Sequence, residues 1–175
     1  GEISLATLIR RERKALKIDP GAPAPTWRLA RALVAQGRRD EAISLLMKLT
    51  TASPTFAWAH FDLGRSLRER GDLGAAEAAF ARATEVDPLG TIAAFSAASA
   101  ARVAAERHDE PARARHAARA RELSPGIARA QLEGGRARLT EGDERAAREL
   151  LTLAAAVTPM DLEVLDLLRR LEKKD

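Results

Sequence analysis

Arginine recurs in this chain at a spacing that could place several guanidinium groups side by side. The members of the series are Arg31, Arg65, Arg136 and Arg170, which are 34, 71 and 34 residues apart. A guanidinium fork binds a carboxylate through two parallel hydrogen bonds and also stacks on aromatic rings. The series therefore predicts a column of arginines for an acidic ligand, which Arg102 is expected to join and Arg68 to flank.

Aromatic side chains keep the same spacing. Trp27, Phe61 and Phe95 are 34 residues apart, and Trp58 lies about one helical turn before Phe61. In a helix these rings would stand one turn before the arginines, so the ligand is expected to be an acidic peptide with apolar side chains, or the C-terminus of a chain. Two alternatives stay open: the rings pack against neighbouring helices, and nearby acids neutralise the arginines through i, i+3 and i, i+4 pairs. The acids within reach are Asp62, Glu69, Glu106 and Glu133.

The remaining residues form no recognisable catalytic or metal-binding set. The sequence has no Cys, and His108 and His116 lie eight residues apart with no third ligand at a matching spacing. No Ser, His and Asp combine into a nucleophilic site, and no pair of shielded carboxylates stands out. The stretch 63–88 contains glycines but lacks the strand and the Gly-Lys-Ser/Thr sequence of a phosphate-binding loop. We therefore expect no enzyme activity, no cofactor and no metal.

Two basic clusters, at 10–14 and 113–121, are interpreted as solvated helix faces. The alternative is contact with nucleic-acid phosphates or an anionic lipid surface. Neither cluster contains Phe, Trp or Tyr for base stacking, and Glu12 interrupts the arginines of the first, which argues against nucleic acid as a partner. The net charge of +4 and the pI of 10.1 permit an anionic partner without requiring one.

Composition favours an all-α fold. Of the 175 residues, 46% are hydrophobic and 31% charged, and the strong helix formers Ala, Leu, Arg and Glu dominate. The bias toward Ala and Arg is typical of GC-rich bacterial genomes. The longest apolar runs, such as 150–157, are far shorter than the roughly 20 residues of a membrane span, so no transmembrane segment is expected.

Prolines and glycines divide the chain into periods of 34 residues. Pro20, Pro54 and Pro88 are 34 apart, as are Pro125 and Pro159, with one odd step of 37 between the two groups. Pro cannot continue a helix and pushes the residue before it toward extended backbone. A second series, in phase with the prolines, suits the left-handed backbone that follows a helix; it consists of Gly37, Gly71 and Gly142. Each period therefore predicts a helix, a glycine turn, a second helix and a proline turn.

This pattern resembles the tetratricopeptide repeat family. One period carries all of the matching positions, namely Leu63, Gly64, Gly71, Ala76, Phe80, Ala83 and Pro88. The resemblance implies a right-handed α-solenoid of antiparallel helix pairs, in which the first helix of each repeat lines a concave groove. We expect one domain over 1–175, with an N-terminal helix at 2–19, repeats at 23–56, 57–90, 91–127 and 128–161, and a C-terminal capping helix at 162–175.

The third repeat departs from the pattern. It has three extra residues, His108 stands where the turn glycine belongs, and Pro111 falls at the start of its second helix. Because Pro is tolerated in a first helical turn, the helix is expected to form. The unpaired helix at the N-terminus would be expected if the chain is a piece of a longer protein.

The resemblance implies a scaffold or adaptor that binds a partner protein or peptide in its groove and has no chemistry of its own. The alternatives are a non-catalytic repeat region of a larger enzyme or assembly protein, and a binder of nucleic acid or anionic surfaces. Tetratricopeptide repeat proteins of the chaperone-adaptor kind bind a carboxylate with Lys and Asn side chains at set places in the groove. The sequence contains no Asn, so a carboxylate clamp of this kind is not expected. The partner's identity and the oligomeric state are left open. A cytoplasmic location is slightly favoured, with a periplasmic or membrane-anchored one as the alternative if a leader has been removed.

Overall fold

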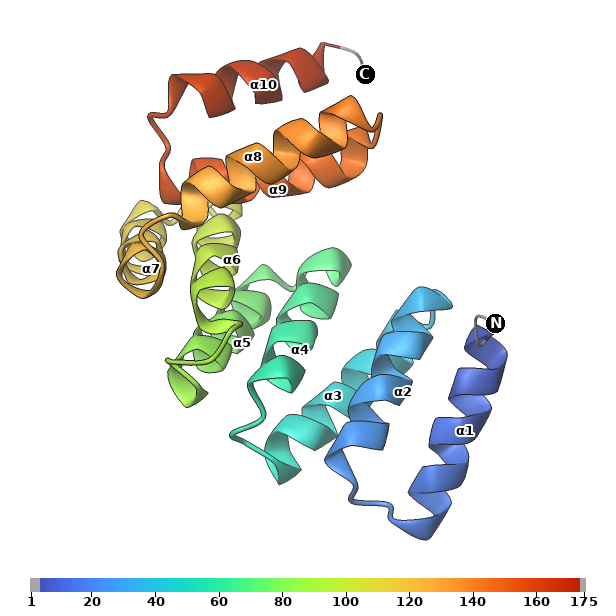
Figure 1. Cartoon of the computed structure of the whole chain (residues 1–175). Helices are drawn as coiled ribbons and strands as arrows, with labels where there is room; N and C mark the ends of the chain where they lie inside the picture. Colours follow the sequence, from blue (N-terminus) through green and yellow to red (C-terminus); the bar gives the residue numbers. More distant parts are fainter. Residues whose placement is uncertain (1–3, 174–175) are drawn as a thin grey trace. The chain divides into compact units, whose positions relative to one another are not determined.

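The computed structural model describes residues 4–173 of the chain. Within this range the chain forms ten α-helices and no strand (Figure 1). The helices are α1 (Leu5–Ile18), α2 (Pro23–Ala35), α3 (Arg39–Ala52), α4 (Ala57–Arg70), α5 (Leu73–Val86), α6 (Ala93–Glu106), α7 (Glu110–Leu123), α8 (Ile127–Thr140), α9 (Glu144–Val157) and α10 (Leu162–Glu172). The predicted terminal helices extend at their outer ends, over 2–3 and 174–175, beyond the described residues.

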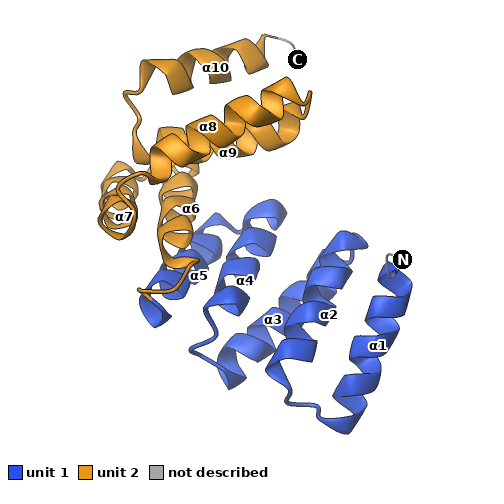
Figure 2. Ribbon diagram, viewed as in Figure 1, with its two compact units in different colours: residues 1–87 blue, residues 88–175 orange. Residues whose placement is uncertain are grey.

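The chain divides into two compact units, residues 1–87 and residues 88–175 (Figure 2). Unit 1 contains α1 to α5 and unit 2 contains α6 to α10. The single domain expected from the sequence stays a prediction.

In unit 1 every helix packs against the next one along the chain. α2 and α4 also touch each other directly, and α3 packs against both (Figure 1). The close approach of α4 and α5 depends on Gly64, because a Cβ atom at this position would lie 2.9 Å from the ring of Phe80. This close approach positions the α4 face that the candidate site uses.

The turns between paired helices follow the predicted glycine pattern. Gly37, Gly71 and Gly142 have φ angles of 79°, 95° and 79°, the left-handed backbone that glycine adopts without steric cost. His108, in the degenerate repeat, adopts the same conformation with φ of 58°. The helix that follows it, α7, begins with Pro111 in its first turn, as expected.

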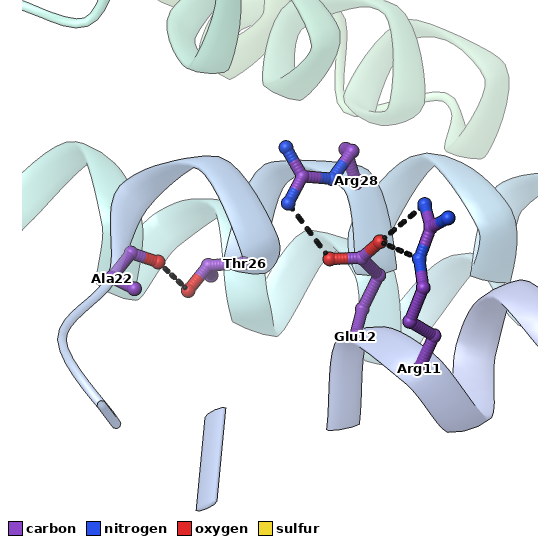
Figure 3. A network of polar contacts seen from close by, with 5 residues as sticks. All are labelled: Arg11, Glu12, Ala22, Thr26 and Arg28. Carbon is purple, nitrogen blue, oxygen red and sulfur yellow. Dashed lines mark hydrogen bonds and ion pairs between the residues drawn. The ribbon is translucent and has the colours of Figure 1, made fainter. Parts of the chain in front are cut away.

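A buried carboxylate fastens α1 to α2 (Figure 3). The Glu12 side chain is 1% exposed and accepts hydrogen bonds from Arg28 Nη2 at 3.0 Å and from Arg11 Nη2 at 2.9 Å. The hydrogen bond from Arg28 is the main cause that lowers the pKa of Glu12 below its ordinary value of 4.5; burial opposes it and Arg11 adds to it. In the first turn of α2, the Thr26 hydroxyl donates to the Ala22 carbonyl oxygen at 2.8 Å.

Unit 2 is built around α9, which packs against α6, α7, α8 and α10. In unit 1 the second helix of a pair, α3, packs on the first helix of the next pair, α4. The equivalent contact in unit 2, between α7 and α8, is small, and α9 takes its place against α6 and α7. The reason lies in the side chains: α9 buries six residues, whereas α8 buries three.

Small residues allow α9 to lie close to α6 and α7. Leu153 and Val157 of α9 pack with Ala97 and Ala98 of α6 and with Ala120 of α7. The carbonyl oxygens at the end of α9, which have no partner within the helix, accept hydrogen bonds from arginines of α7. Arg113 Nη1 donates to the carbonyl of residue 156 at 2.8 Å, and Arg121 Nη1 donates to that of Val157 at 2.7 Å.

Candidate functional site

The side-by-side packing of α2 and α4 brings four of the predicted site residues onto one face of unit 1. These are Trp27 and Arg31 on α2, and Trp58 and Arg65 on α4. Along each helix the aromatic and the basic residue lie one or two turns apart, so they share a face. We call this surface the α2–α4 face.

The Asp62 carboxylate lies at the centre of the α2–α4 face. Its side chain is 9% exposed and accepts a hydrogen bond from Trp27 Nε1 at 2.7 Å. Arg31 Nε lies 3.8 Å from one carboxylate oxygen, and Arg65 Nη1 lies 3.4 Å from the other. Two half-exposed guanidinium groups therefore share one carboxylate, which leaves a net charge of +1 and several N–H donors directed to solvent.

The two tryptophans form an aromatic surface beside these arginines. Their ring centroids are 6.1 Å apart, and the guanidinium carbon of Arg31 lies 5.0 Å from the Trp27 centroid, a cation–π distance. Trp58 is 41% exposed, which is high for so large a ring. Phe61 is instead buried, with its centroid 5.5 Å from that of Phe80, so it belongs to the core.

A hollow of about 260 Å³ opens next to the arginine pair. Its lining consists of Arg31, Val34, Ala35, Leu46, Asp62, Arg65, Ser66 and Glu69. The acid at its far end, Glu69, accepts a hydrogen bond from Arg39 Nη2 at 2.7 Å, so its charge is balanced from α3. The hollow thus combines apolar side chains with two cations that compete for one carboxylate.

The corresponding arginines of unit 2 have one carboxylate each. Arg136 pairs with Glu163, and Arg170 pairs with Asp166 one turn earlier in α10. A hollow of about 390 Å³ beside Arg136 is lined by two arginines and three acids. Its charged residues are Arg129, Glu133, Arg136, Asp161 and Glu163. The surface around these two arginines of unit 2 therefore carries no excess of positive charge.

The other three predicted site residues lie in different surroundings. Arg102 has a side chain that is 9% exposed and pairs with Glu149 of α9 and with Glu106, so it joins α6 to α9. Phe95 is half-buried and packs against the core of unit 2. Arg68 lies partly buried in the last turn of α4. A single arginine column along both units stays a prediction.

Sequence reasoning identified only part of the role of Asp62. The i, i+3 pair with Arg65, which the sequence left open as an alternative to ligand binding, is present. The contacts with Trp27 and Arg31 join neighbouring repeats and were not predicted. The signal was available, because Asp62 follows Trp27 by 35 residues, one residue more than the period.

Tetratricopeptide repeat profiles match the chain at residues 12–52 and 61–110, together more than half of its length. The chain belongs to the tetratricopeptide repeat family. The predicted all-α fold of repeated helix pairs is thereby confirmed. A comparison with curated proteins finds no match.

Several solved structures share this fold. A crystal structure of MamA aligns with a TM-score of 0.65 and 21% identity, covering 97% of this chain and 91% of that one. The structure of MamA from residue 41 to its end, from Desulfovibrio magneticus RS-1, gives 0.60 and 15%, with coverages of 88% and 85%. TTC0263, a thermophilic tetratricopeptide repeat protein of Thermus thermophilus, gives 0.58 and 22%, with coverages of 97% and 89%.

Tetratricopeptide repeat proteins are in general protein-interaction scaffolds and typically non-catalytic. Among residues 4–173, no three or more His, Asp or Glu side chains are placed to hold a metal ion. No helix in that range is long and apolar enough to cross a membrane.

Proposed function

We propose that this protein is a scaffold whose α2–α4 face binds a segment of a partner protein. The observation that carries the proposal is that Arg31 and Arg65 share the single carboxylate of Asp62. Two half-exposed tryptophans lie beside this group. Surface charge that is only half balanced, next to exposed aromatic rings, is the composition of a binding hot spot rather than of an ordinary solvated face.

The chemistry of the face defines the class of ligand. The outward N–H groups of Arg31 and Arg65 would bind a carboxylate, either of an acidic side chain or of a chain terminus. Trp58, which lies outside the hollow, would hold an apolar side chain of the same segment. Asp62 would repel an acid placed below the guanidinium groups, so the ligand's carboxylate must approach them from the solvent side.

We expect modest affinity. A short segment that uses one charged and one apolar anchor would bind with a Kd on the order of micromolar, equivalent to about −8 kcal/mol. Electrostatic complementarity would raise the association rate and make it fall with added salt.

The experiment is a selection of peptides from a random display library on the full chain, followed by titration of the selected peptides. We expect enrichment of sequences with an acidic residue near an aromatic or large aliphatic one. Trp58→Ser should weaken binding about ten-fold or more, as expected for an aromatic anchor. Arg31→Lys with Arg65→Lys should also weaken it, because Lys keeps the charge but loses the bidentate fork.

The matched control is Arg136→Lys with Arg170→Lys, which makes the same chemical change on the arginines of unit 2. These two residues are exposed and individually paired, so the control should bind as the wild type does. Equal loss in both double variants, or enriched peptides without acidic residues, would contradict the proposal.

A further inference from the structure

The excess positive charge of the chain is concentrated in α1. Within Leu5–Ile18 there are five basic residues, Arg10, Arg11, Arg13, Lys14 and Lys17, and one acid, Glu12, for a net charge of +4. The whole chain also carries +4, from 29 basic and 25 acidic residues. The remaining 24 basic and 24 acidic residues therefore balance.

Three cations of α1 lie on the side of the helix opposite its buried carboxylate. At about 100° per residue, Arg10, Lys14 and Lys17 fall within one narrow sector, opposite the buried Glu12. All three are exposed. Ile18 lies at the end of the same side and is 82% exposed. We call these four residues the α1 basic face.

The three cations of the α1 basic face differ from most arginines of the chain. Elsewhere arginines are commonly paired with a carboxylate, as with Arg38 and Glu41 or Arg129 and Glu133. Among residues 4–173, Arg10, Lys14 and Lys17 have no ion pair. Their neighbours do interact with acids: Arg11 holds Glu12, and the charge of Arg13 helps to lower the pKa of Glu41.

A hollow of about 540 Å³ runs along these cations. Its basic residues are Arg10, Arg13, Lys14, Lys17 and Arg38, and its other lining residues are Ala6, Ile9 and Gln36. No carboxylate lines it, so it would attract anionic groups small enough to enter, such as phosphate esters.

We propose that the α1 basic face binds the surface of a bilayer that contains anionic phospholipids. From Arg10 to Lys17 the cations span seven residue steps of the helix, about 11 Å along its axis, so they can contact one flat surface together, as an interfacial helix requires. Ile18, beside Lys14 and Lys17, would enter the boundary between head groups and acyl chains. The face shares no residue with the α2–α4 face, so the two contacts are independent.

The same residues fit other partners less well. Single-stranded nucleic acid would need aromatic side chains for base stacking, and the hollow has none. A helix packed on this face would have to supply carboxylates for three cations or bury them unpaired, at a high desolvation cost. Two of the five lysines of the chain lie here, and Lys is a hydrated point charge that suits a diffuse layer of head groups.

The test is co-sedimentation of the full chain with vesicles of phosphatidylcholine alone and of phosphatidylcholine with about a third phosphatidylglycerol. Binding should require phosphatidylglycerol and should weaken as salt is raised. Arg10→Gln, Lys14→Gln and Lys17→Gln together should weaken binding by about 100-fold, from about five-fold per basic residue. Because these side chains are exposed, the melting temperature should change little.

Two further variants complete the test. Lys48→Gln, Arg115→Gln and Arg145→Gln together remove the same charge from exposed positions on α3, α7 and α9, and should retain most of the binding. Ile18→Ser should weaken vesicle binding by about five-fold. It should leave unchanged any binding to a duplex oligonucleotide at the same phosphate concentration.

The proposal would be overturned by any of three results. Neutral and anionic vesicles could bind equally, the α1 triple variant and its control could lose binding equally, or the oligonucleotide could bind more tightly than the anionic vesicles. The last result would assign the face to nucleic-acid phosphates instead.

Discussion

At the scale of single residues, the geometry of the α2–α4 face depends on Asp62, which three side chains approach from two helices. Replacing Asp62 with Ala leaves the Trp27 indole N–H without its acceptor and the two arginines without their shared carboxylate. We expect the free energy of unfolding to fall by about 1–3 kcal/mol, measured by urea denaturation.

Asp62→Asn separates the hydrogen bond from the charge. The amide oxygen can still accept from Trp27, so this variant should lose less stability than Asp62→Ala. Equal stability of Asp62→Ala and the wild type would show that the contacts of Asp62 contribute nothing to the fold.

Substitution of Gly64 tests the close packing of α4 on α5. An added methyl group would meet the Phe80 ring at 2.9 Å, so Gly64→Ala should destabilise the protein by about 1–3 kcal/mol despite the higher helix propensity of Ala. Gly74, inside α5, is the matched control because nothing lies within 4 Å of its added Cβ. Thermal unfolding should show Gly74→Ala equal to or more stable than the wild type; a lower melting temperature would contradict this.

The sequence predicted residue types better than their surroundings. Trp27, Arg31, Trp58 and Arg65 share a face because the period of 34 residues places equivalent positions of successive repeats side by side. The same reasoning placed Phe61 with them, yet its ring is buried against Phe80. A period identifies equivalent positions, but whether a ring points into the core depends on the packing of the adjacent helices.

At the scale of helices, the ion pair between α1 and α2 gives a pH-dependent stability. The pKa of Glu12 is lowered in the folded state, so its contribution is fully present above about pH 4.5 and is lost as the pH falls through the folded pKa. The difference in unfolding free energy between the wild type and Glu12→Gln should be largest near pH 7, at about 1–3 kcal/mol. It should shrink below about pH 4.5, and a difference that is constant with pH would contradict the assignment.

Substitution of Arg102 tests the contact between α6 and α9. Its buried guanidinium pairs with Glu149, so Arg102→Gln should cost about 1–3 kcal/mol of stability. Arg170→Gln, which removes an exposed pair within α10, should cost no more than about 0.5 kcal/mol. Chemical denaturation of both variants checks this, and equal stabilities would mean that Arg102 does not join the two helices.

The helices themselves were predictable, and their docking in unit 2 was not. Pro, Gly and apolar spacing specify where helices begin and end, and even His108 takes the backbone of the glycine it replaces. The packing of α9 on α6 and α7 depends on the alanines of those helices and on the small number of buried side chains in α8. The shapes of the side chains between helices decide how the helices dock. A repeat pattern, which describes one helix pair at a time, carries no information about these shapes.

At the scale of the whole molecule, charge is distributed unevenly. Unit 1 carries the α1 basic face and the half-balanced arginines of the α2–α4 face, whereas the hollow of unit 2 is lined by more acids than bases. We therefore propose that unit 1 binds the ligand, and we expect the ion pairs of unit 2 to contribute to its stability.

Titration of the uniformly 15N-labelled chain with a library-selected peptide tests this assignment most directly. The chain contains only two tryptophans, and both lie on the α2–α4 face, so the two indole N–H signals report on the proposed site alone. We predict that both signals shift with the micromolar affinity of the peptide, while backbone amides of α8 and α10 do not. Saturable peptide binding that leaves both indole signals in place and shifts the amides of unit 2 would contradict the central claim.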